Sequence, residues 1–441
     1  MKIHLIAIGG KVMHNLALEL SAQGHTISGS DDEIYDPARS RLEAAGLLPE
    51  EGWDADTVTT DIDLIILGMH AHLDNPELLR AQELGIEVVS FPEYVGKYST
   101  SPTKVVISGS HGKSTTTAMI MHALMTLGED ADYLLGGLLD GFDRMVRLSG
   151  APIMIIEGDE YLSSRVDPLP KMLHYHGQIV VITGIEWDHK NVFPTEEDYI
   201  SQFDILLAQC AKENAALIWY GEDTHLQRLI SSRRDLDQIT YKQYRSQDNH
   251  VVHDDQTYPL QIFGDHNMAN LKAAALVCMK LGISEPNFLT AMSSFKGVGK
   301  RLELIHKDPM IYLDYAHAPS KVRATVHAVR SNFPDKKILA VYELHTYSSL
   351  SEDFLPQYIG TLDQADQAIV YFDHHALGIK RLPDLDKSKV HAGFNKADLV
   401  VISEYEELET SLATHVGLYD IILMMSSGTF GGLDLQKIIH A

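Results

Sequence analysis

The stretch "VVISGSHGKSTTTAMIMHALM" (residues 105–125) constrains the fold more than any other part of the chain. A run of β-branched apolar residues ends in Gly-Ser-His-Gly-Lys-Ser, and a segment of helical composition follows. A strand that passes through a glycine-rich turn into a helix is the unit from which parallel α/β sheets are built. The turn also gathers backbone N–H groups at the positive end of the helix dipole, where an anion can bind. We therefore expect an α/β protein with a phosphate-binding loop.

The loop within this stretch contains the groups that a nucleoside triphosphate requires. Lys113 supplies a positive charge for the β- and γ-phosphates, and the hydroxyl of Ser114 can bind Mg²⁺. Ile107 stands where the full Walker pattern has its first glycine, so a glycine-rich turn with an incidental lysine is the alternative. The order of strand, loop, lysine, hydroxyl and helix favours an ATP site. Its predicted phosphate contacts are Gly109, Ser110, His111, Gly112, Lys113, Ser114 and Thr115.

Acidic side chains follow two further apolar runs, "PIMIIEGDE" and "QIVVITGIEWDH". Ligands of open α/β sheets bind at the carboxyl ends of the strands, and Mg²⁺ prefers oxygen ligands. These runs therefore predict a magnesium site beside the loop, although solvated acidic loops are the simpler alternative. A histidine at such a site suits Mg²⁺ less well than a carboxylate. The side chains concerned are Glu157, Asp159, Glu160, Glu186, Asp188 and His189.

Short apolar runs alternate with amphipathic segments along the whole chain, which predicts parallel sheets covered by helices. We expect three domains. The first is Rossmann-like and covers residues 1–100, the central one contains the phosphate-binding loop and covers 101–298, and the last is Rossmann-like over 299–441. A more polar, alternating stretch at 214–260 predicts a small antiparallel excursion.

The N-terminal block contains a second glycine turn. Gly9 and Gly10 follow the apolar run "KIHLIAI", and Asp31 ends the next run, 21 residues after Gly10. In Rossmann folds a carboxylate at this place binds a ribose hydroxyl, while the glycine turn admits a pyrophosphate. The full G-x-G-x-x-G pattern is missing, so a plain strand–helix turn stays open as the alternative.

Composition excludes several classes of protein. The net charge of −25 argues against a nucleic-acid partner or binding to an anionic membrane. Two cysteines, Cys210 and Cys278, lie in apolar helical stretches and are expected to be buried thiols. No apolar run approaches about 18 residues, and the N-terminus lacks a signal peptide pattern. We expect a cytoplasmic protein without membrane insertion.

Seven motifs then occur in order: "GSHGKSTTTA", "IEGDEY", "IEWDH", "FGDHNMAN", "GKRLEL", "DYAHAP" and "MMSSGTFGG". Their joint order resembles the Mur ligase family, the ATP-dependent amide-forming enzymes of peptidoglycan assembly, over essentially the whole chain. The resemblance implies a UDP-binding N-terminal domain, a central ATPase and a C-terminal Rossmann-like domain that closes over the nucleotide.

The resemblance also implies roles for individual residues. Lys113, Arg301 and His189 would be catalytic, and Ser114, Glu160 and His189 would serve Mg²⁺. The UDP end of the acceptor would contact Gly9, Gly10 and Asp31, and the amine substrate would contact His345. Beyond the loop, the implied ATP contacts are His266, Asn267, Asn270, Arg301, Asp314 and His317.

Two branches of the family fit best. One adds L-alanine to UDP-N-acetylmuramate, and the other, a recycling ligase, attaches L-Ala-γ-D-Glu-meso-diaminopimelate to the same acceptor. "EGDEYLSS", "IEWDH", "RLEL" and "MSSGTFGG" are closer to the second branch. Departures from the family pattern are Gly184 in place of an asparagine, Val12 in place of a glycine, and "YELHTYSS" without the usual proline and arginine.

The implied reaction phosphorylates the acceptor carboxylate with ATP, and an amine then displaces phosphate from the acyl phosphate. The hydroxyl-rich stretch 345–349 would bind the peptide by hydrogen bonds more than by charge. Two rivals come from other classes: a nucleotide-binding regulatory module with little hydrolysis, and a small-molecule kinase. A kinase would not need a Rossmann-like domain at each end.

Overall fold

The computed structural model describes residues 1–139, 141–187, 192–247, 249–299, 301–380 and 382–435. These residues form two compact units. The first unit comprises Met1–Tyr244, Val252–Tyr258 and Ala269–Ser293. The second comprises Arg245–Val251, Pro259–Met268 and Ser294–Ala441.

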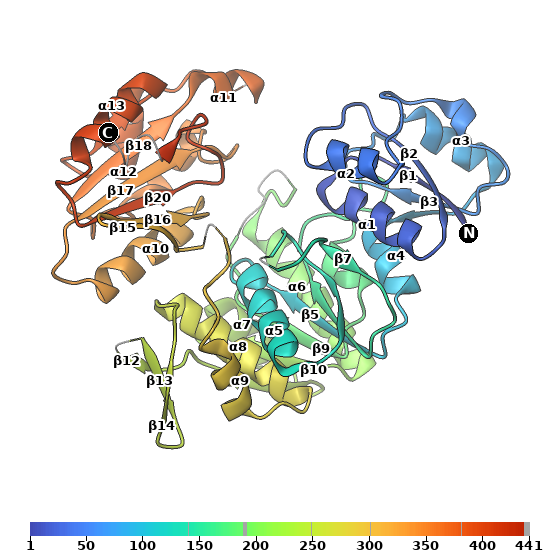
Figure 1. Cartoon of the computed structure of the whole chain (residues 1–441), viewed down its shortest axis with the longest axis horizontal. Helices are drawn as coiled ribbons and strands as arrows, with labels where there is room; N and C mark the ends of the chain where they lie inside the picture. Colours follow the sequence, from blue (N-terminus) through green and yellow to red (C-terminus); the bar gives the residue numbers. More distant parts are fainter. Residues whose placement is uncertain (140, 188–191, 248, 300, 381, 436–441) are drawn as a thin grey trace. The chain divides into compact units, whose positions relative to one another are not determined.

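The N-terminal part of the first unit is a four-stranded parallel sheet in the order β2-β1-β3-β4 (Figure 1). Its inner strand β3 is buried at every position, as expected for a parallel strand covered on both faces. The strands are β1 (Lys2–Ile6), β2 (Thr26–Ser30), β3 (Leu64–Leu67) and β4 (Val88–Ser90). The helices are α1 (Lys11–Ala22), α2 (Ala38–Ala44), α3 (Pro76–Leu84) and α4 (Phe91–Tyr98).

The same unit contains a seven-stranded sheet in the order β11-β10-β9-β5-β8-β6-β7, parallel except for the pair β6 and β7. Strand β5, which leads into the loop, lies between β8 and β9. These two neighbours are the acid-tipped strands, the apolar strands that run into the acidic residues predicted to bind Mg²⁺. The strands are β5 (Thr103–Ser108), β6 (Ala131–Leu134), β7 (Val146–Arg147), β8 (Ile153–Glu157), β9 (Ile179–Ile182), β10 (Ala216–Tyr220) and β11 (Asp237–Tyr241). The helices are α5 (Lys113–Leu127), α6 (Glu196–Glu213), α7 (Thr224–Ile230) and α9 (Glu285–Met292). Helix α8 (Asp265–Lys280) belongs to the second unit up to Met268 and to the first unit from Ala269.

Helix α1 joins the two sheets of this unit. The side-chain oxygen of Asn15 accepts a hydrogen bond from the Met145 N–H at 3.1 Å, just before β7. One carboxylate oxygen of Glu19 accepts from the Leu148 N–H at 3.0 Å, just after it. At the start of the helix, Lys11 Nζ donates to the carbonyl oxygen of Gly136 at 3.3 Å. Helix α1 is therefore one connection between the N-terminal sheet and the central sheet. Helix α4 makes another, because Lys104 Nζ on β5 donates to the Gly96 carbonyl at 2.7 Å.

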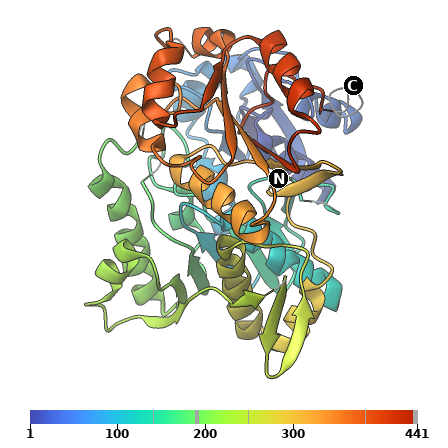
Figure 2. The same cartoon turned by 90° about the vertical axis from the view of Figure 1, so that its left-hand side faces the viewer.

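The second unit contains a six-stranded sheet in the order β15-β16-β20-β17-β18-β19, parallel except for the hairpin of β15 and β16. Alternate residues of β17 belong to two different apolar clusters, with Ala340 and Tyr342 in one and Leu339 and Val341 in the other. Both faces of the sheet are thus covered, and helices lie on each side in Figure 2. The strands are β15 (Glu303–Lys307), β16 (Met310–Asp314), β17 (Ile338–Leu344), β18 (Gln367–Phe372), β19 (Val400–Ile402) and β20 (Ile421–Met425). The helices are α10 (Pro319–Asn332), α11 (His374–Ile379), α12 (Lys387–Phe394) and α13 (Tyr405–His415).

The α/β fold class is confirmed, with three sheets of mostly parallel strands. The antiparallel excursion is shorter than 214–260. Strands β10 and β11 extend the central sheet in parallel, because the apolar run "ALIWY" is buried and α7 supplies the crossover. A separate three-stranded sheet holds β12 (Ser246–Gln247), β13 (His250–His253) and β14 (Gln256–Pro259). Among the described residues, no helix combines the length and apolar character needed to cross a membrane.

The two glycines that bracket α5 give a matched test of loop packing. Gly112 and Gly128 both have left-handed backbones, with φ of 80° and 77°, so an alanine at either costs roughly 1 kcal/mol. A Cβ at Gly128 meets nothing within 4 Å, whereas one at Gly112 collides with the buried side chain of Asn270. We expect Gly112→Ala to lower the thermal unfolding midpoint more than Gly128→Ala, and Asn270→Ala to relieve the difference. Equal midpoints for the two single variants would contradict this packing.

Candidate functional site

The loop between β5 and α5 is hydrogen-bonded to the residues that follow strand β9. The Ser110 N–H donates to the Gly184 carbonyl at 2.9 Å, and the Thr183 hydroxyl donates to the carbonyl of His111. Gly109 has a φ of 121°, and a Cβ there would collide with Thr183. Only glycine fits at this position, so the loop backbone is held in one shape at the carboxyl ends of the central strands.

Lys113, the first residue of α5, reaches back over the loop. Its Nζ donates to the Gly109 carbonyl at 2.7 Å and pairs with Glu160 Oε2 at 2.6 Å, while Asp159 lies 4.0 Å away. Burial opposes the positive charge of Lys113, but Glu160 and Asp159 outweigh burial and hold its pKa above the usual lysine value. The ammonium is therefore positive at neutral pH, as a phosphate ligand must be.

Ser114 binds a second carboxylate. Its hydroxyl donates to Glu157 Oε1 at 2.8 Å, and the Gly136 N–H donates to Glu157 Oε2 at 3.0 Å. A Cβ on Gly136 would lie 2.5 Å from Glu157 Oε1, so this glycine permits the close approach. From sequence, Glu157 stands in an acidic group without a role of its own. Its position as the last residue of a buried strand is the signal that identifies it.

The donor set beside the loop suits Mg²⁺. Ser114, Glu157 and Glu160 offer hydroxyl and carboxylate oxygens, which are the ligands that this ion prefers. Within the described part of the chain, no three acidic, histidine or cysteine side chains form a ready-made metal cage. Mg²⁺ usually takes one or two carboxylates from a protein and completes its shell with phosphate and water. His189 and Asp188 lie outside the described residues, and the role of His189 stays a prediction.

The remaining loop residues connect to the end of β9 and to helix α6. His111 Nε2 lies 2.7 Å from Glu186 Oε2, and the Glu186 N–H donates to Ser110 Oγ at 2.7 Å. Ser110 Oγ is 2.8 Å from the hydroxyl of Tyr199, which donates to Glu160 Oε1 at 2.9 Å. The loop, both acid-tipped strands and α6 therefore share one hydrogen-bond network. Tyr199 is not recognisable from sequence, because it occupies an ordinary core position of an amphipathic helix.

The N-terminal glycine turn and Asp31 lie in contact with each other. The Gly9 N–H donates to Asp31 Oδ2 at 2.7 Å, and a Cβ on Gly9 would lie 2.8 Å from that oxygen. Gly10 caps the first turn of α1. Asp31 is 5% exposed, and burial, with a contribution from the neighbouring Asp32, raises its pKa to about 7. The contact of this turn with UDP stays a prediction.

In the second unit, three predicted nucleotide contacts lie together at one corner, around the end of β16. They are Arg301, Asp314 and His317. The Leu302 N–H donates to Asp314 Oδ2 at 2.8 Å, which ties the segment that follows Arg301 to the end of β16. The Arg301 guanidinium lies 5.1 Å from the centre of the Tyr315 ring. His317 follows Asp314 and Tyr315 in the same segment, and its carbonyl accepts a hydrogen bond from the Tyr342 hydroxyl at 2.8 Å. Asp314 is 8% exposed and orders this corner.

The motif "FGDHNMAN" is divided between the units. Asn270 belongs to the first unit, with its side chain against Gly112 of the loop. His266 and Asn267 belong to the second unit, and Asn267 Nδ2 donates to the Phe263 carbonyl at 2.8 Å. Only Asn270 is thus placed next to the loop, and the approach of the second unit's residues to ATP stays a prediction.

His345 follows β17 and faces a buried carboxylate. Its Nδ1 lies 3.7 Å from Glu343 Oε1, and Glu343 is 3% exposed. Glu343 Oε2 accepts hydrogen bonds from the Ser426 hydroxyl and from the Phe430 N–H, the latter at 2.9 Å. Glu343 is another acid that ends an apolar strand, so the pattern used for the central sheet also marks it. In the turn that follows, two hydroxyls bond to one another: Thr346 Oγ1 donates to the fully buried Ser349 Oγ at 3.0 Å.

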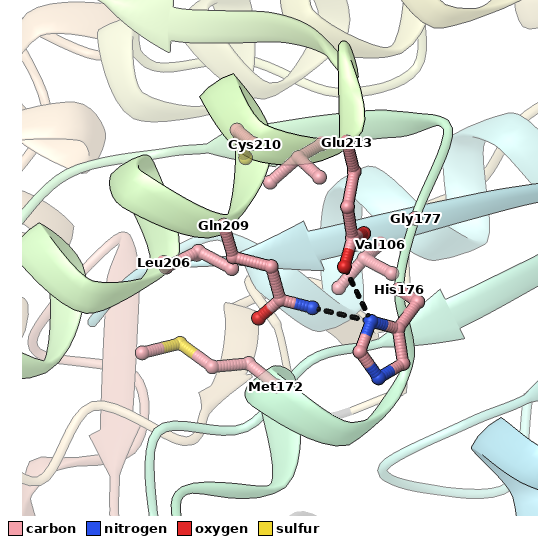
Figure 3. Close-up of a pocket in the computed structure, with 9 residues that line it drawn as sticks. Val106, Met172, His176, Gly177, Leu206, Gln209, Cys210 and Glu213 are labelled. Atoms are coloured by element: carbon pink, nitrogen blue, oxygen red, sulfur yellow. Dashed lines mark hydrogen bonds and ion pairs between the residues drawn. The ribbon is translucent and has the colours of Figure 1, made fainter.

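A small cavity lies at the opposite end of the central sheet, beneath the segment that precedes β9 (Figure 3). His176 Nδ1 lies 2.7 Å from both Glu213 Oε1 and Gln209 Nε2. The cavity holds about 10 Å³, the lower limit for one water molecule. Cys210 lines it, and burial raises the pKa of that thiol to about 12. Cys278 is buried too, so both thiols are inert core side chains.

Three family models match successive parts of the chain. They are the Mur ligase family catalytic domain over residues 2–101, the Mur ligase middle domain over 107–278, and the Mur ligase glutamate ligase domain over 300–428. The UDP-N-acetylmuramate–L-alanine ligase of Lactobacillus gasseri is 30% identical over 367 residues, which cover 79% of each chain.

Two solved structures are similar as well. The UDP-N-acetylmuramate-alanine ligase MurC of Thermotoga maritima is 20% identical, with a TM-score of 0.70, and the match covers 100% of this chain and 97% of that one. The UDP-N-acetylmuramate:L-alanyl-γ-D-glutamyl-meso-diaminopimelate ligase of Neisseria meningitidis is 25% identical, with a TM-score of 0.61, over 67% of this chain and 98% of that one. With the family models along its length and a phosphate loop at the centre, the chain belongs to the Mur ligase family and is an ATP-dependent ligase of peptidoglycan biosynthesis.

Proposed function

We propose that this Mur ligase joins L-Ala-γ-D-Glu-meso-diaminopimelate to UDP-N-acetylmuramate through an acyl phosphate. The observation that carries the phosphoryl-transfer part is Lys113, held at the phosphate loop between the Gly109 carbonyl and Glu160. Four sequence motifs and the similarity to the Neisseria ligase support the tripeptide as the amine. The 30% identity to the Lactobacillus enzyme supports L-alanine, which is the second candidate.

The first half-reaction needs charge neutralisation and alignment. A carboxylate oxygen of the acceptor attacks the γ-phosphorus, and ADP leaves. Backbone N–H groups of residues 109–115 bind the phosphates, and Lys113 neutralises charge that develops on the transferring phosphoryl group. Ser114, Glu157 and Glu160 would hold Mg²⁺, which would supply further positive charge at the phosphates. Arg301, presented by the corner around Asp314, is assigned to the same task.

The second half-reaction forms the amide. The amine nitrogen attacks the acyl carbon, a tetrahedral intermediate forms, and inorganic phosphate leaves as the nitrogen loses a proton. We assign the amine substrate to the ends of β17 and β20, where His345 stands beside Glu343 and the Ser426 hydroxyl. Exposed Tyr347 adds a phenol hydroxyl, whereas Thr346 and Ser349 bond to one another within the turn. Hydrogen bonds of this kind allow shorter and longer peptides as well.

Lys113→Ala should abolish most of the turnover. Loss of a key cation at a transferring phosphoryl group costs about 3–5 kcal/mol of transition-state stabilisation, or on the order of 10²–10⁴ in rate. The measurement is ligase turnover at saturating ATP, with Lys97→Ala, an exposed lysine paired with Glu87, as the control. Lys113→Ala/Glu160→Gln removes the uncompensated buried acid, so it should recover the unfolding midpoint without recovering turnover. Activity of Lys113→Ala within tenfold of the native protein would exclude the role.

A competition assay identifies the amine. The native protein is incubated with ATP, Mg²⁺, UDP-N-acetylmuramate, and the tripeptide and L-alanine at equal concentrations, and the products are resolved by mass. We expect the tripeptide product to predominate, with ADP and phosphate released only when acceptor and amine are both present. Predominant alanine addition would place the chain in the other branch. A stable phosphoester would instead indicate a kinase, and no ADP at all a regulatory module.

Binding of the acceptor should depend on the ionisation of Asp31. The ribose hydroxyls donate best to a carboxylate, and the pKa of Asp31 is raised to about 7 in the folded protein by burial. Below that pH, binding must release a proton, so the affinity for UDP-N-acetylmuramate should increase from pH 5.5 to 7.5 and then level off. Asp31→Asn should bind more weakly without this rise, as measured by calorimetry. A parallel rise in both proteins would assign the titration to another group.

A further inference from the structure

We propose that Tyr199 is a positioning residue of the phosphoryl-transfer site: its hydroxyl fixes one oxygen of Glu160, so that the other stays aimed at the loop when Lys113 turns to phosphate. The inference rests on the proposed function, because it assigns Glu160 to the metal and Lys113 to the transferring group. It concerns a side chain on α6 that neither the motifs nor the glycine loop includes.

The position of the Tyr199 ring is set by packing rather than by the site. Tyr199 is fully buried, and its ring meets Phe193 and Phe203 edge-on, with centroids 5.4 and 5.5 Å away. The start of α6 is fixed independently by a capping box between Thr195 and Asp198. A phenylalanine at position 199 would keep these apolar contacts. The hydroxyl alone therefore accounts for the polar contacts of this residue.

Only one assignment of donors and acceptors satisfies these hydrogen bonds. The Glu186 N–H donates to Ser110 Oγ at 2.7 Å, and the Tyr199 hydroxyl donates its single proton to Glu160 Oε1 at 2.9 Å, since an ionised carboxylate only accepts. In the 2.8 Å contact between the two hydroxyls, Ser110 must then be the donor. Glu160 Oε2 is left for Lys113. The two oxygens of Glu160 thus have different partners.

This division matters when Lys113 engages a phosphate. Glu160 is 1% exposed, so a side chain held only by Lys113 would follow the ammonium and compete with the phosphate for it. With Oε1 tied to Tyr199, the carboxylate keeps its place and presents Oε2 to the cation that accompanies the nucleotide. Partners that orient a metal ligand in this way typically change metal affinity by about 10–100-fold when they are removed.

The test compares Tyr199→Phe with Tyr241→Phe. Tyr241 is an equally buried phenol on β11, at the far edge of the same sheet. Binding of a fluorescent ADP analogue is titrated with Mg²⁺ and, separately, measured in EDTA, and ligase turnover is followed against Mg²⁺. For Tyr199→Phe we expect the Mg²⁺ midpoint to rise by roughly tenfold or more in both assays, with binding in EDTA changed less than about twofold. Tyr241→Phe should match the native protein.

Three further variants test the route of the effect. Glu160→Gln should raise the Mg²⁺ midpoint by itself, and adding Tyr199→Phe to it should produce little further change, because the tyrosine acts through that carboxylate. Ser110→Ala should shift the midpoint less than Tyr199→Phe. An unchanged Mg²⁺ midpoint in Tyr199→Phe, or an equal loss of binding in EDTA, would overturn the proposal. If the native protein binds nucleotide but ligates no amine, the proposed function fails, while the binding titration still decides the role of Tyr199.

Discussion

The ion pair between Lys113 and Glu160 is the interaction on which the site depends. A lysine that must meet phosphate inside a folded domain needs a carboxylate nearby, because a buried ammonium without one is neutralised or expelled. Placing that carboxylate requires β8 beside β5, and holding it requires α6 to approach from the other side. The loop, the order of strands in the sheet and the packing of α6 therefore all help to position the ion pair of Lys113 and Glu160.

This arrangement explains why the loop works without the first Walker glycine. Ile107 is fully buried inside β5 and contributes to the sheet core. The sharp change of direction falls later, at Gly109 and Gly112, where the backbone turns left-handed and neighbouring side chains leave no space for a Cβ. A position two residues before the turn has no need of glycine, so an apolar strand residue is the better choice there.

Much of the fold could be predicted from the sequence, because apolar runs, glycine turns and helical segments are local signals. The same holds for the placement of Lys113 and Ser114 at the start of a helix, which follows from strand–turn–helix geometry. Other features depend on distant parts of the chain. The bond of Glu157 to Ser114 requires the order of strands in the sheet, and Tyr199 has the appearance of any core aromatic residue. The start of the antiparallel excursion differs from the prediction because β10 and β11 are short strands in a polar region, and a local pattern does not reveal which sheet a strand joins.

The backbone of Gly136 has a consequence for how this enzyme varies. Its oxygen accepts from Lys11 at the start of α1, and its N–H donates to Glu157 beside the phosphate loop. The N-terminal glycine turn and the phosphate loop thus both depend on the backbone of this one residue, which has no room for a side chain. Substitutions on the two sides are coupled through Gly136 and are not expected to be additive. A change at the N-terminal turn that moves Gly136 is therefore expected to alter the contact that holds Glu157 beside Ser114.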